Sequence, residues 1–319
     1  MFGEVCARVT ELYNHGIPGL SPSFYTWKEE KNYAWGDKDT NYASAEQHYN
    51  DYREGSSDTR TTNNAYLGSG YSYHTPDHSQ WSGSSVIDFR MHRSFGDINK
   101  AFNDACNDDG HFNDATYNVV YVDSHDYAPE PEDGIRPSYS EAEWAEKMNM
   151  MFTFRGIPCL YYGTEVRLSA GKKIDEGPNL ALANSGRAYF GDYLEGNITA
   201  NGFGNYSSAD GAVKSTLETP LAQHLRMLNK MRLQVPALQQ GQYARVGDRA
   251  FVRRYNNSVA CVVFSGSANF SGLPSGTYVD LVTGDTKTGT SFTASANGQG
   301  NLRVYVLNGS KVGGSNFAK

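Results

Sequence analysis

The sequence predicts an α/β protein in which strands and helices alternate, followed by a small antiparallel β-sandwich. Two features support this prediction. Between about residues 84 and 236, short β-rich runs alternate with segments of helical period, which favours βαβ units and a parallel sheet. Beyond about Gly241, β-rich runs follow one another with turn signals between them. The chain has 319 residues, 39% of them hydrophobic, which is enough for one or two domains with a sizeable core.

The first strand and helix of this alternation are expected between residues 84 and 103. Ser84–Met91 predicts a short strand, and Ser94–Asn103 predicts a helix because apolar residues recur there every three or four positions. The next strand is expected at residues 118–122, whose sequence NVVYV is rich in β-branched residues. It leads directly into the polar segment of residues 123–126.

A capping box marks the next helix. Ser140 and Glu143 have the S-x-x-E spacing in which each side chain satisfies a backbone N–H of the first turn, and the apolar stripe behind them stops at Gly156. Ile157–Tyr162 predicts the strand that follows. After a Gly-rich polar stretch, a last helix is expected from Thr219-Pro220, with Pro236 ending it.

The C-terminal part, residues 239–319, is predicted to be a separate all-β domain. Its β-rich runs are short and are separated by turn signals such as Asn256-Asn257 and Thr283-Gly284-Asp285, which is typical of an antiparallel sandwich. Four runs carry the prediction: Ala250–Tyr255, Val259–Ser265, Thr277–Val282 and Leu302–Leu307.

The region of about residues 7–85 has neither helical nor strand period and is far longer than an ordinary loop. Its density of Tyr and Trp argues against disorder, since disordered segments are poor in aromatic residues. The rings are expected either to form a platform for sugar rings or to pack on one another within an inserted loop.

Composition excludes several classes of partner. The formal net charge is −7 and there is no run of Lys and Arg, which argues against nucleic acid and anionic membranes. No apolar stretch approaches the roughly 18 residues of a membrane span. We therefore expect neither a nucleic-acid nor a membrane partner.

No metal site is predicted from the sequence. Residues 37–41 resemble the start of an EF-hand loop, but Tyr42 stands where glycine is required. His74 and His78 have the spacing of a zinc-binding helix, but Pro76 between them spoils that helix. The four cysteines form no C-x-x-C pair: Cys6, Cys106, Cys159 and Cys261.

Two carboxylates stand at the ends of predicted strands. Glu4 follows the strand-like residues 1–3, and Asp126 follows the NVVYV run. If both strands belong to one parallel barrel, both carboxylates open onto its C-terminal face, where barrel enzymes carry out their chemistry. Paired carboxylates are the minimal equipment for glycoside hydrolysis. The alternative is a pair of surface carboxylates at the starts of loops.

Three ordered motifs resemble those of the α-amylase family of glycoside hydrolases, family thirteen. Residues 2–5 (FGEV) resemble its fifth-strand segment with the acid/base Glu. Residues 120–126 (VYVDSHD) resemble its seventh-strand segment ending in His-Asp, and residues 156–165 (GIPCLYYGTE) resemble its eighth-strand segment. Ser124 departs from the pattern, which has Asn before His-Asp, so the hydrogen bonding that orients His125 is in doubt.

The resemblance implies a role for each matching residue. Glu4 would protonate the glycosidic oxygen and later deprotonate the attacking water. Asp126 would grip sugar hydroxyls and stabilise the distorted ring in the transition state. His125 would hydrogen-bond the same sugar.

The resemblance also implies that residues 1–238 are the C-terminal half of a (β/α)8 TIM barrel, strands five to eight, with the aromatic insertion inside it. The family's nucleophile, an Asp in a G-x-R-x-D pattern on the fourth strand, is not found, and residues 88–92 (DFRMH) are only a decoy. We therefore expect the sequence to be part of a longer enzyme whose first half precedes Met1. The family's usual Ca²⁺ site would lie mostly in that half, and no cofactor is needed for the chemistry.

The expected function is retaining hydrolysis of the α-1,4-glucosidic bonds of starch-like glucans, with this chain alone inactive. Two alternatives stay open: a non-catalytic α-glucan-binding product, because loss of the nucleophile removes the covalent step, and a transglycosylase of the same family. Secretion or another extracytoplasmic location is expected from the family, since starch is a polymer outside the cell.

Overall fold

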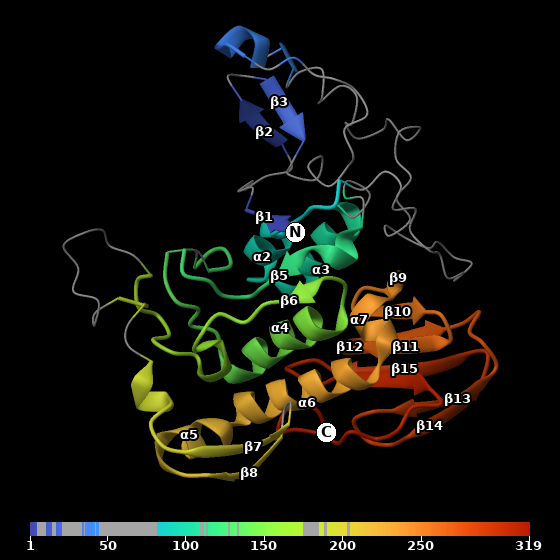
Figure 1. Ribbon diagram of the computed structural model, residues 1–319. Coiled ribbons are helices and arrows are strands. Elements are labelled where there is room, and N and C mark those ends of the chain that lie inside the picture. The colour runs from blue at the N-terminus through green and yellow to red at the C-terminus, as the bar shows by residue number, and fades with distance from the viewer. Residues whose placement is uncertain are drawn as a thin grey trace.

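The computed structural model describes residues 1–4, 11–14, 17–20, 34, 36–41, 43–44, 82–108, 112, 114–126, 128–132, 134–174, 185–187, 190–202 and 205–319. Most of the aromatic insertion, with Cys6, His74 and His78, lies outside these residues. The N-terminal strand lies near the helices α2 and α3, and the C-terminal β-strands pack beside the helices α4, α6 and α7 (Figure 1). Among the described helices, none is long and apolar enough to cross a membrane.

Four short strand segments lie side by side in chain order and run parallel. They are β1 (Phe2–Gly3), β4 (Ser85–Val86), β5 (Val119–Val120) and β6 (Ile157–Pro158). β1 pairs with β4, a bridge from Ile87 to Val119 links β4 to β5, and β5 pairs with β6. The predicted parallel arrangement is present, although each strand is shorter than predicted.

The first predicted strand and helix have different bounds in the structure. Strand character stops before Asp88, because the Asp88 side chain accepts a hydrogen bond from the Met91 N–H and caps helix α2 (Phe89–Ser94). Helix α3 (Ile98–Asp108) begins after a break in which Asp97 accepts from the next backbone N–H groups. The predicted strand at 84–91 is therefore wrong in its second half, and the predicted helix at 94–103 is divided.

Helix α4 (Glu141–Thr153) confirms the predicted capping box. Ser140 accepts from the Glu143 N–H, and the Glu143 carboxylate accepts from the Ser140 N–H at 2.9 Å. Gly156 then turns the chain into β6 with a φ of +101°. A Cβ there would lie 2.3 Å from Cγ2 of Val120, so both its conformation and its packing require glycine.

The polar stretch after β6 contains regular structure that the sequence does not predict. It includes the antiparallel pair β7 (Ile198–Gly202) and β8 (Asn205–Ala209) and the helix α5 (Gly211–Leu217). An N-terminal pair, β2 (Glu11–Asn14) and β3 (Ile17–Leu20), is also antiparallel. Short 3-10 turns are η5 (Ala115–Tyr117), η6 (Thr164–Val166) and η8 (Gly191–Tyr193).

Helix α6 (Pro220–Gln234) begins where the Thr219-Pro220 signal predicts. The Thr219 hydroxyl accepts from the Ala222 N–H, and Pro220 occupies the first turn, where its missing N–H costs nothing. Pro236 ends α6 and begins the short helix α7 (Pro236–Gln240). Helix α6 lies along α4 and packs against it (Figure 1).

The C-terminal part is an antiparallel sandwich of a large sheet and a small one. The strands of the large sheet follow the order β14-β13-β16-β11-β10-β9, and β12 and β15 form the small sheet. The bounds are β9 (Gln242–Gly247), β10 (Ala250–Tyr255), β11 (Ser258–Val263), β12 (Ser265–Phe270), β13 (Gly276–Asp280), β14 (Thr286–Gly289), β15 (Phe292–Asn297) and β16 (Arg303–Leu307).

The strands β10 and β11 in the large sheet are buried on both faces. Alternate residues of β10 and β11, such as Phe251 and Val262, join the core formed with α3, α4, α6 and α7. Their neighbours, such as Val252 and Val263, join a second core against β12 and β15. The core of the helical part therefore continues into the C-terminal sheet.

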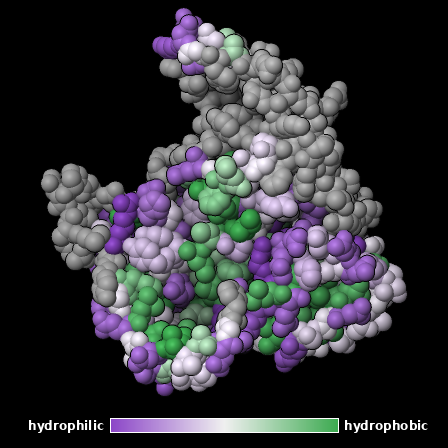
Figure 2. Space-filling view, viewed as in Figure 1, coloured by the Kyte–Doolittle hydropathy of each residue, from purple (hydrophilic) through white to green (hydrophobic). Residues whose placement is uncertain are grey.

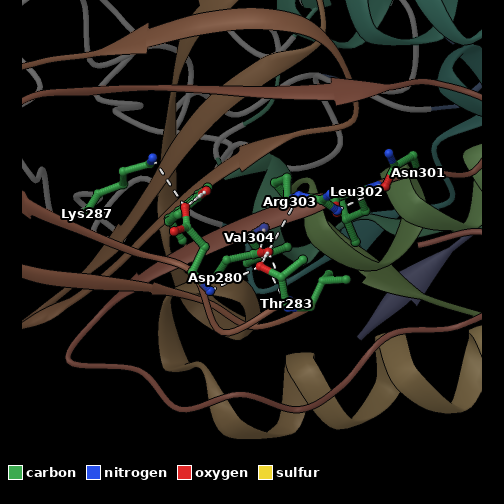
Figure 3. A network of polar contacts seen from close by, with 10 residues as sticks. Asp280, Thr283, Lys287, Asn301, Leu302, Arg303 and Val304 are labelled. Carbon is green, nitrogen blue, oxygen red and sulfur yellow. Dashed lines mark hydrogen bonds and ion pairs between the residues drawn. The ribbon is translucent and has the colours of Figure 1, made fainter. Parts of the chain in front are cut away.

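A buried carboxylate joins β13 to β16. Asp280 is fully buried and accepts hydrogen bonds from the Thr283 hydroxyl at 2.6 Å, the Thr283 N–H at 3.0 Å and the Val304 N–H at 2.9 Å (Figure 3). Arg303 Nε lies 3.6 Å from the same carboxylate. The Asp280 side chain thus joins the turn after β13 to β16, alongside the backbone hydrogen bonds within that turn.

Candidate active site

His125 and Asp126 lie together after the carboxyl end of β5. Val120 and Val122 are buried, but so are Val119, Tyr121 and Asp123, so burial does not alternate along this segment. His125 Nε2 is 3.0 Å from Oδ2 of Asp126, and the two side chains are 62% and 38% exposed. The Ser124 hydroxyl accepts a hydrogen bond from the Asp126 N–H at 3.2 Å, so the residue that departs from the family pattern helps to shape this turn.

Arg187 contacts both of these residues. Its Nη2 lies 3.1 Å from Oδ1 of Asp126, and its Nε donates to the carbonyl oxygen of His125 at 2.8 Å. His125 and Arg187 therefore approach different oxygens of one carboxylate. A carboxylate held in this way keeps lone pairs directed outward for further donors, such as sugar hydroxyls.

A buried ion pair lies directly behind this surface pair. Asp123 and Arg136 are almost completely buried, and Nη2 of Arg136 is 2.6 Å from Oδ2 of Asp123. Burial raises the pKa of Asp123 to about 6, while the Arg136 guanidinium acts in the opposite direction. The Thr164 hydroxyl donates to the same oxygen over 3.5 Å.

Arg136 also connects the segments around the pair. Its guanidinium donates to the carbonyl oxygens of Tyr162 and Gly186, both at 3.2 Å, and lies 4.8 Å from the centre of the Tyr161 ring. The Tyr161 ring is 6.3 Å from that of His125. One buried side chain thus links the end of β5, the segment after β6 and the segment that carries Arg187.

Glu4 is exposed and follows β1 directly. Since β1 and β5 belong to the same parallel array, Glu4 and Asp126 both follow the carboxyl ends of their strands. Within the described part of the chain, no hydrogen bond or ion pair joins Glu4 to Asp126 or His125. The structure therefore brings His125 and Asp126 into contact and leaves Glu4 at the same edge of the array without contacting them.

A groove of about 520 Å³ lies elsewhere, between α6 and the β7–β8 hairpin. It is mainly apolar and is lined by Leu160, Glu165, Tyr206, Leu225 and Arg226, among others. His125 and Asp126 are not part of its wall. Glu165, the last residue of the third motif, therefore faces this groove.

Sequence reasoning missed Arg136 and Arg187. Arg187 is 61 positions from Asp126 and lies in a Gly-rich stretch without period, so no local pattern indicates it. Arg136 follows Asp123 within one connecting segment. Because Asp123 comes directly after a buried strand, a nearby arginine in the sequence could have been recognised as its partner. The decoy Asp88 is structural, since it is buried against Arg155 and caps α2.

The described residues hold no group of three or more His, Cys, Asp or Glu side chains that could bind a metal ion. At the EF-hand-like segment, Asp37 instead accepts a hydrogen bond from the Thr40 N–H at 2.9 Å.

No family model matches the chain, and no curated protein matches it. Among solved structures it is similar to an α-amylase from Geobacillus thermoleovorans in complex with acarbose, with 14% identity, a TM-score of 0.48, and coverage of 71% of this chain and 48% of that one. An Anoxybacillus α-amylase has 16% identity and a TM-score of 0.46, with coverage of 71% of this chain and 48% of that one. A γ-cyclodextrin glucanotransferase from alkalophilic Bacillus clarkii has 19% identity and a TM-score of 0.46, with coverage of 72% of this chain and 33% of that one. The chain thus spans half or less of these structures.

Proposed function

We propose that this chain forms part of a retaining glycoside hydrolase that cleaves α-1,4-glucosidic bonds of starch-like glucans. The observation that carries the proposal is the His125–Asp126 pair after β5, whose two side chains are in contact and open to solvent. The three motifs that resemble the α-amylase family stand on three members of the parallel array, in the expected order. We further propose that β1, β4, β5 and β6 are strands five to eight of a (β/α)8 barrel.

In this proposal each of the three residues has a separate role toward the sugar. Asp126 accepts hydrogen bonds from sugar hydroxyls and stabilises positive charge on the distorted ring. His125 hydrogen-bonds the same sugar. Glu4 donates a proton to the leaving oxygen and then takes one from water, as retaining glycosidases require of their acid/base residue. The Tyr161 ring lies 6.3 Å from that of His125 and is proposed to contact the apolar face of a pyranose ring.

The printed sequence carries no Asp in a G-x-R-x-D pattern, so the covalent step has no candidate nucleophile among these residues. The chain by itself is therefore proposed to bind α-glucan without hydrolysing it. A transglycosylase is the second candidate within the same chemistry, because water and an acceptor sugar compete for one intermediate. An extracytoplasmic location follows from the polymeric substrate.

Binding of maltoheptaose, measured by titration calorimetry on the 319-residue chain, tests the proposal. We expect measurable binding that is weakened about tenfold or more by Asp126→Asn and by His125→Gln. The matched control is Asp248→Asn, because Asp248 also pairs with an arginine, Arg245, at 3.2 Å but lies elsewhere. Absence of binding by the native chain, or equal binding by all variants, would contradict the proposed function.

A hydrolysis assay on soluble starch with product analysis separates the alternatives. We expect no reducing sugar from the chain alone. Release of sugar by the purified chain would show that a nucleophile is present after all. Formation of longer oligosaccharides in place of shorter ones would favour transglycosylation.

A further inference from the structure

The Asp126 carboxylate is held from two sides by groups that come from different segments. His125 contacts Oδ2, and Arg187 contacts Oδ1 while it also donates to the His125 carbonyl. The Arg187 guanidinium therefore bridges the His125 carbonyl and the Asp126 carboxylate. Because its donors lie in one rigid fork, this bridge restricts the orientation of the Asp126 carboxylate. The orientation of Asp126 therefore depends on where Arg187 is anchored.

The anchor is the buried Arg136. Its Nη1 donates to the carbonyl oxygen of Gly186, the residue directly before Arg187, and the Gly186 N–H donates to the Lys173 carbonyl at 2.6 Å. A Cβ at position 186 would lie 2.6 Å from Cγ of Arg136. The close approach of Arg136 thus requires glycine at 186 and holds the backbone of the Arg187 segment on both sides.

We propose that Arg187 is a positioning residue that presents the Asp126 carboxylate to the sugar in a fixed orientation, and that Arg136 positions Arg187 through the Gly186 backbone. The inference rests on the proposed function, since the role of Asp126 toward a sugar is proposed there. The Arg187 and Asp126 side chains are 32% and 38% exposed, and ion pairs at such positions contribute little to stability. Loss of Arg187 should therefore alter the site much more than the fold.

The imidazole signals of His125 report directly on this arrangement, because its Nε2 contacts the same carboxylate. We would record ring ¹H–¹⁵N correlations of the chain labelled at its 8 histidines, with His125 assigned by the His125→Gln variant. Arg187→Gln is expected to shift and broaden the His125 signals and to weaken maltoheptaose binding about tenfold. Arg187→Lys, which keeps the charge without the fork, is expected to restore little of either.

Arg245→Gln is the matched control. Arg245 is 29% exposed and donates to the Gly247 carbonyl and to Asp248, so it loses the same kinds of contact at a remote place. It is expected to leave the His125 signals and the affinity unchanged. Gly186→Ala provides a second route, because it keeps Arg187 but pushes a methyl group against Arg136; it is expected to shift the His125 signals in the same direction.

Unchanged His125 signals in both Arg187→Gln and Gly186→Ala would overturn the positioning role. If the native chain does not bind maltoheptaose, the proposed function fails, while the His125 signals still decide whether Arg187 fixes Asp126. If binding falls in Arg187→Gln but the His125 signals do not move, Arg187 contacts the sugar itself and does not act through Asp126.

Discussion

His224 is a buried residue with hydrogen-bond partners at both ring nitrogens. Its Nε2 donates to Oδ1 of Asn149, whose amide donates to the backbone of Gly300 and Asn301, and its Nδ1 lies 2.7 Å from the Ser315 hydroxyl oxygen. Burial lowers the pKa of His224 to about 4. One side chain thus ties α6 to α4 and to the C-terminal tail.

This lowered pKa predicts a loss of stability in mild acid. The unfolded chain binds the proton on His224 more tightly than the folded chain does. The stability that comes from the neutral, buried His224 is therefore fully present above pH 6.5 and is lost as the pH falls to 4. The expected loss is about 3 kcal/mol in the free energy of unfolding. Urea unfolding at pH 7, 5.5 and 4 measures it, with His224→Gln as comparison. The same slope of stability against pH in both proteins would contradict this assignment.

Asp280 supports a second prediction at the scale of one residue. Replacing it by Ala leaves the buried Val304 N–H and the Thr283 groups without their acceptor, so Asp280→Ala should lower the free energy of unfolding by more than about 2 kcal/mol. Asp248→Ala, at a residue whose side chain is almost fully exposed, should change it by less than about 0.5 kcal/mol. Similar losses in both variants would show that the network in Figure 3 contributes little.

At the scale of elements, two buried arginines satisfy the carboxyl end of α4. Arg253 of β10 donates to the carbonyl oxygens of Thr153, Phe154 and Gly241, and Arg232 of α6 donates to those of Phe152 and Gly156. Burial lowers the pKa of Arg253 to about 9 and that of Arg232 to about 10. Positive charge at this end also interacts favourably with the helix dipole.

Arg253→Met is therefore expected to cost about 3 kcal/mol or more, because three carbonyl oxygens lose a donor within the protein. Thermal unfolding followed by circular dichroism measures the effect. Arg245→Met on the neighbouring strand β9 is the control, since its side chain is partly exposed and its loss should be much smaller. Equal melting temperatures for Arg253→Met and the native chain would show that the hydrogen bonds from Arg253 to the end of α4 do not stabilise the protein.

Elements with strong local signals were predictable from the sequence. The bounds of β10 match the predicted run at 250–255, and the caps at Ser140 and Thr219 mark the starts of α4 and α6. The hairpin of β7 and β8 was not predictable, because every residue of β7 is exposed and no apolar alternation marks it. Helix α2 was hidden in an apolar run that favours a strand until Asp88 is recognised as a cap.

The candidate site was predictable only in part. His125 and Asp126 follow a recognisable strand, whereas Arg136 and Arg187 reach them through contacts that only the folded chain creates. Periodicity indicates which face is buried, but it does not indicate which distant polar side chain meets a given carboxylate. The arrangement of the site is thus a tertiary property.

At the scale of the whole molecule, one face carries exposed apolar side chains. Figure 2 shows hydrophobic surface down the middle of this face, where β1 and β6 lie in Figure 1. Phe2 in β1 and Ile157 in β6 are 57% and 48% exposed, and on other elements Ile198 in β7 and Leu233 in α6 are 48% and 51% exposed. Parallel strands are normally covered on both faces, and exposed apolar patches promote association.

The chain alone is therefore expected to be poorly soluble, and replacing exposed apolar side chains by charged ones should raise its solubility. Ile198→Lys combined with Leu233→Lys is expected to raise the concentration at which aggregates form, measured by light scattering. The control adds the same charge at exposed polar positions of the small and large sheets, Thr293→Lys with Thr277→Lys. Equal improvement by the control would mean that net charge, and not the exposure of apolar side chains, limits solubility.

The burial of β10 and β11 on both faces also restricts how the chain length can change in evolution. Because Phe251 and Val252 belong to different cores, one inserted residue in β10 would exchange the side chains of both cores at once. In a sheet with one solvated face, the same insertion would disturb only one core. Insertions and deletions among homologues should therefore concentrate in turns such as Asn256-Asn257, and the lengths of β10 and β11 should be constant.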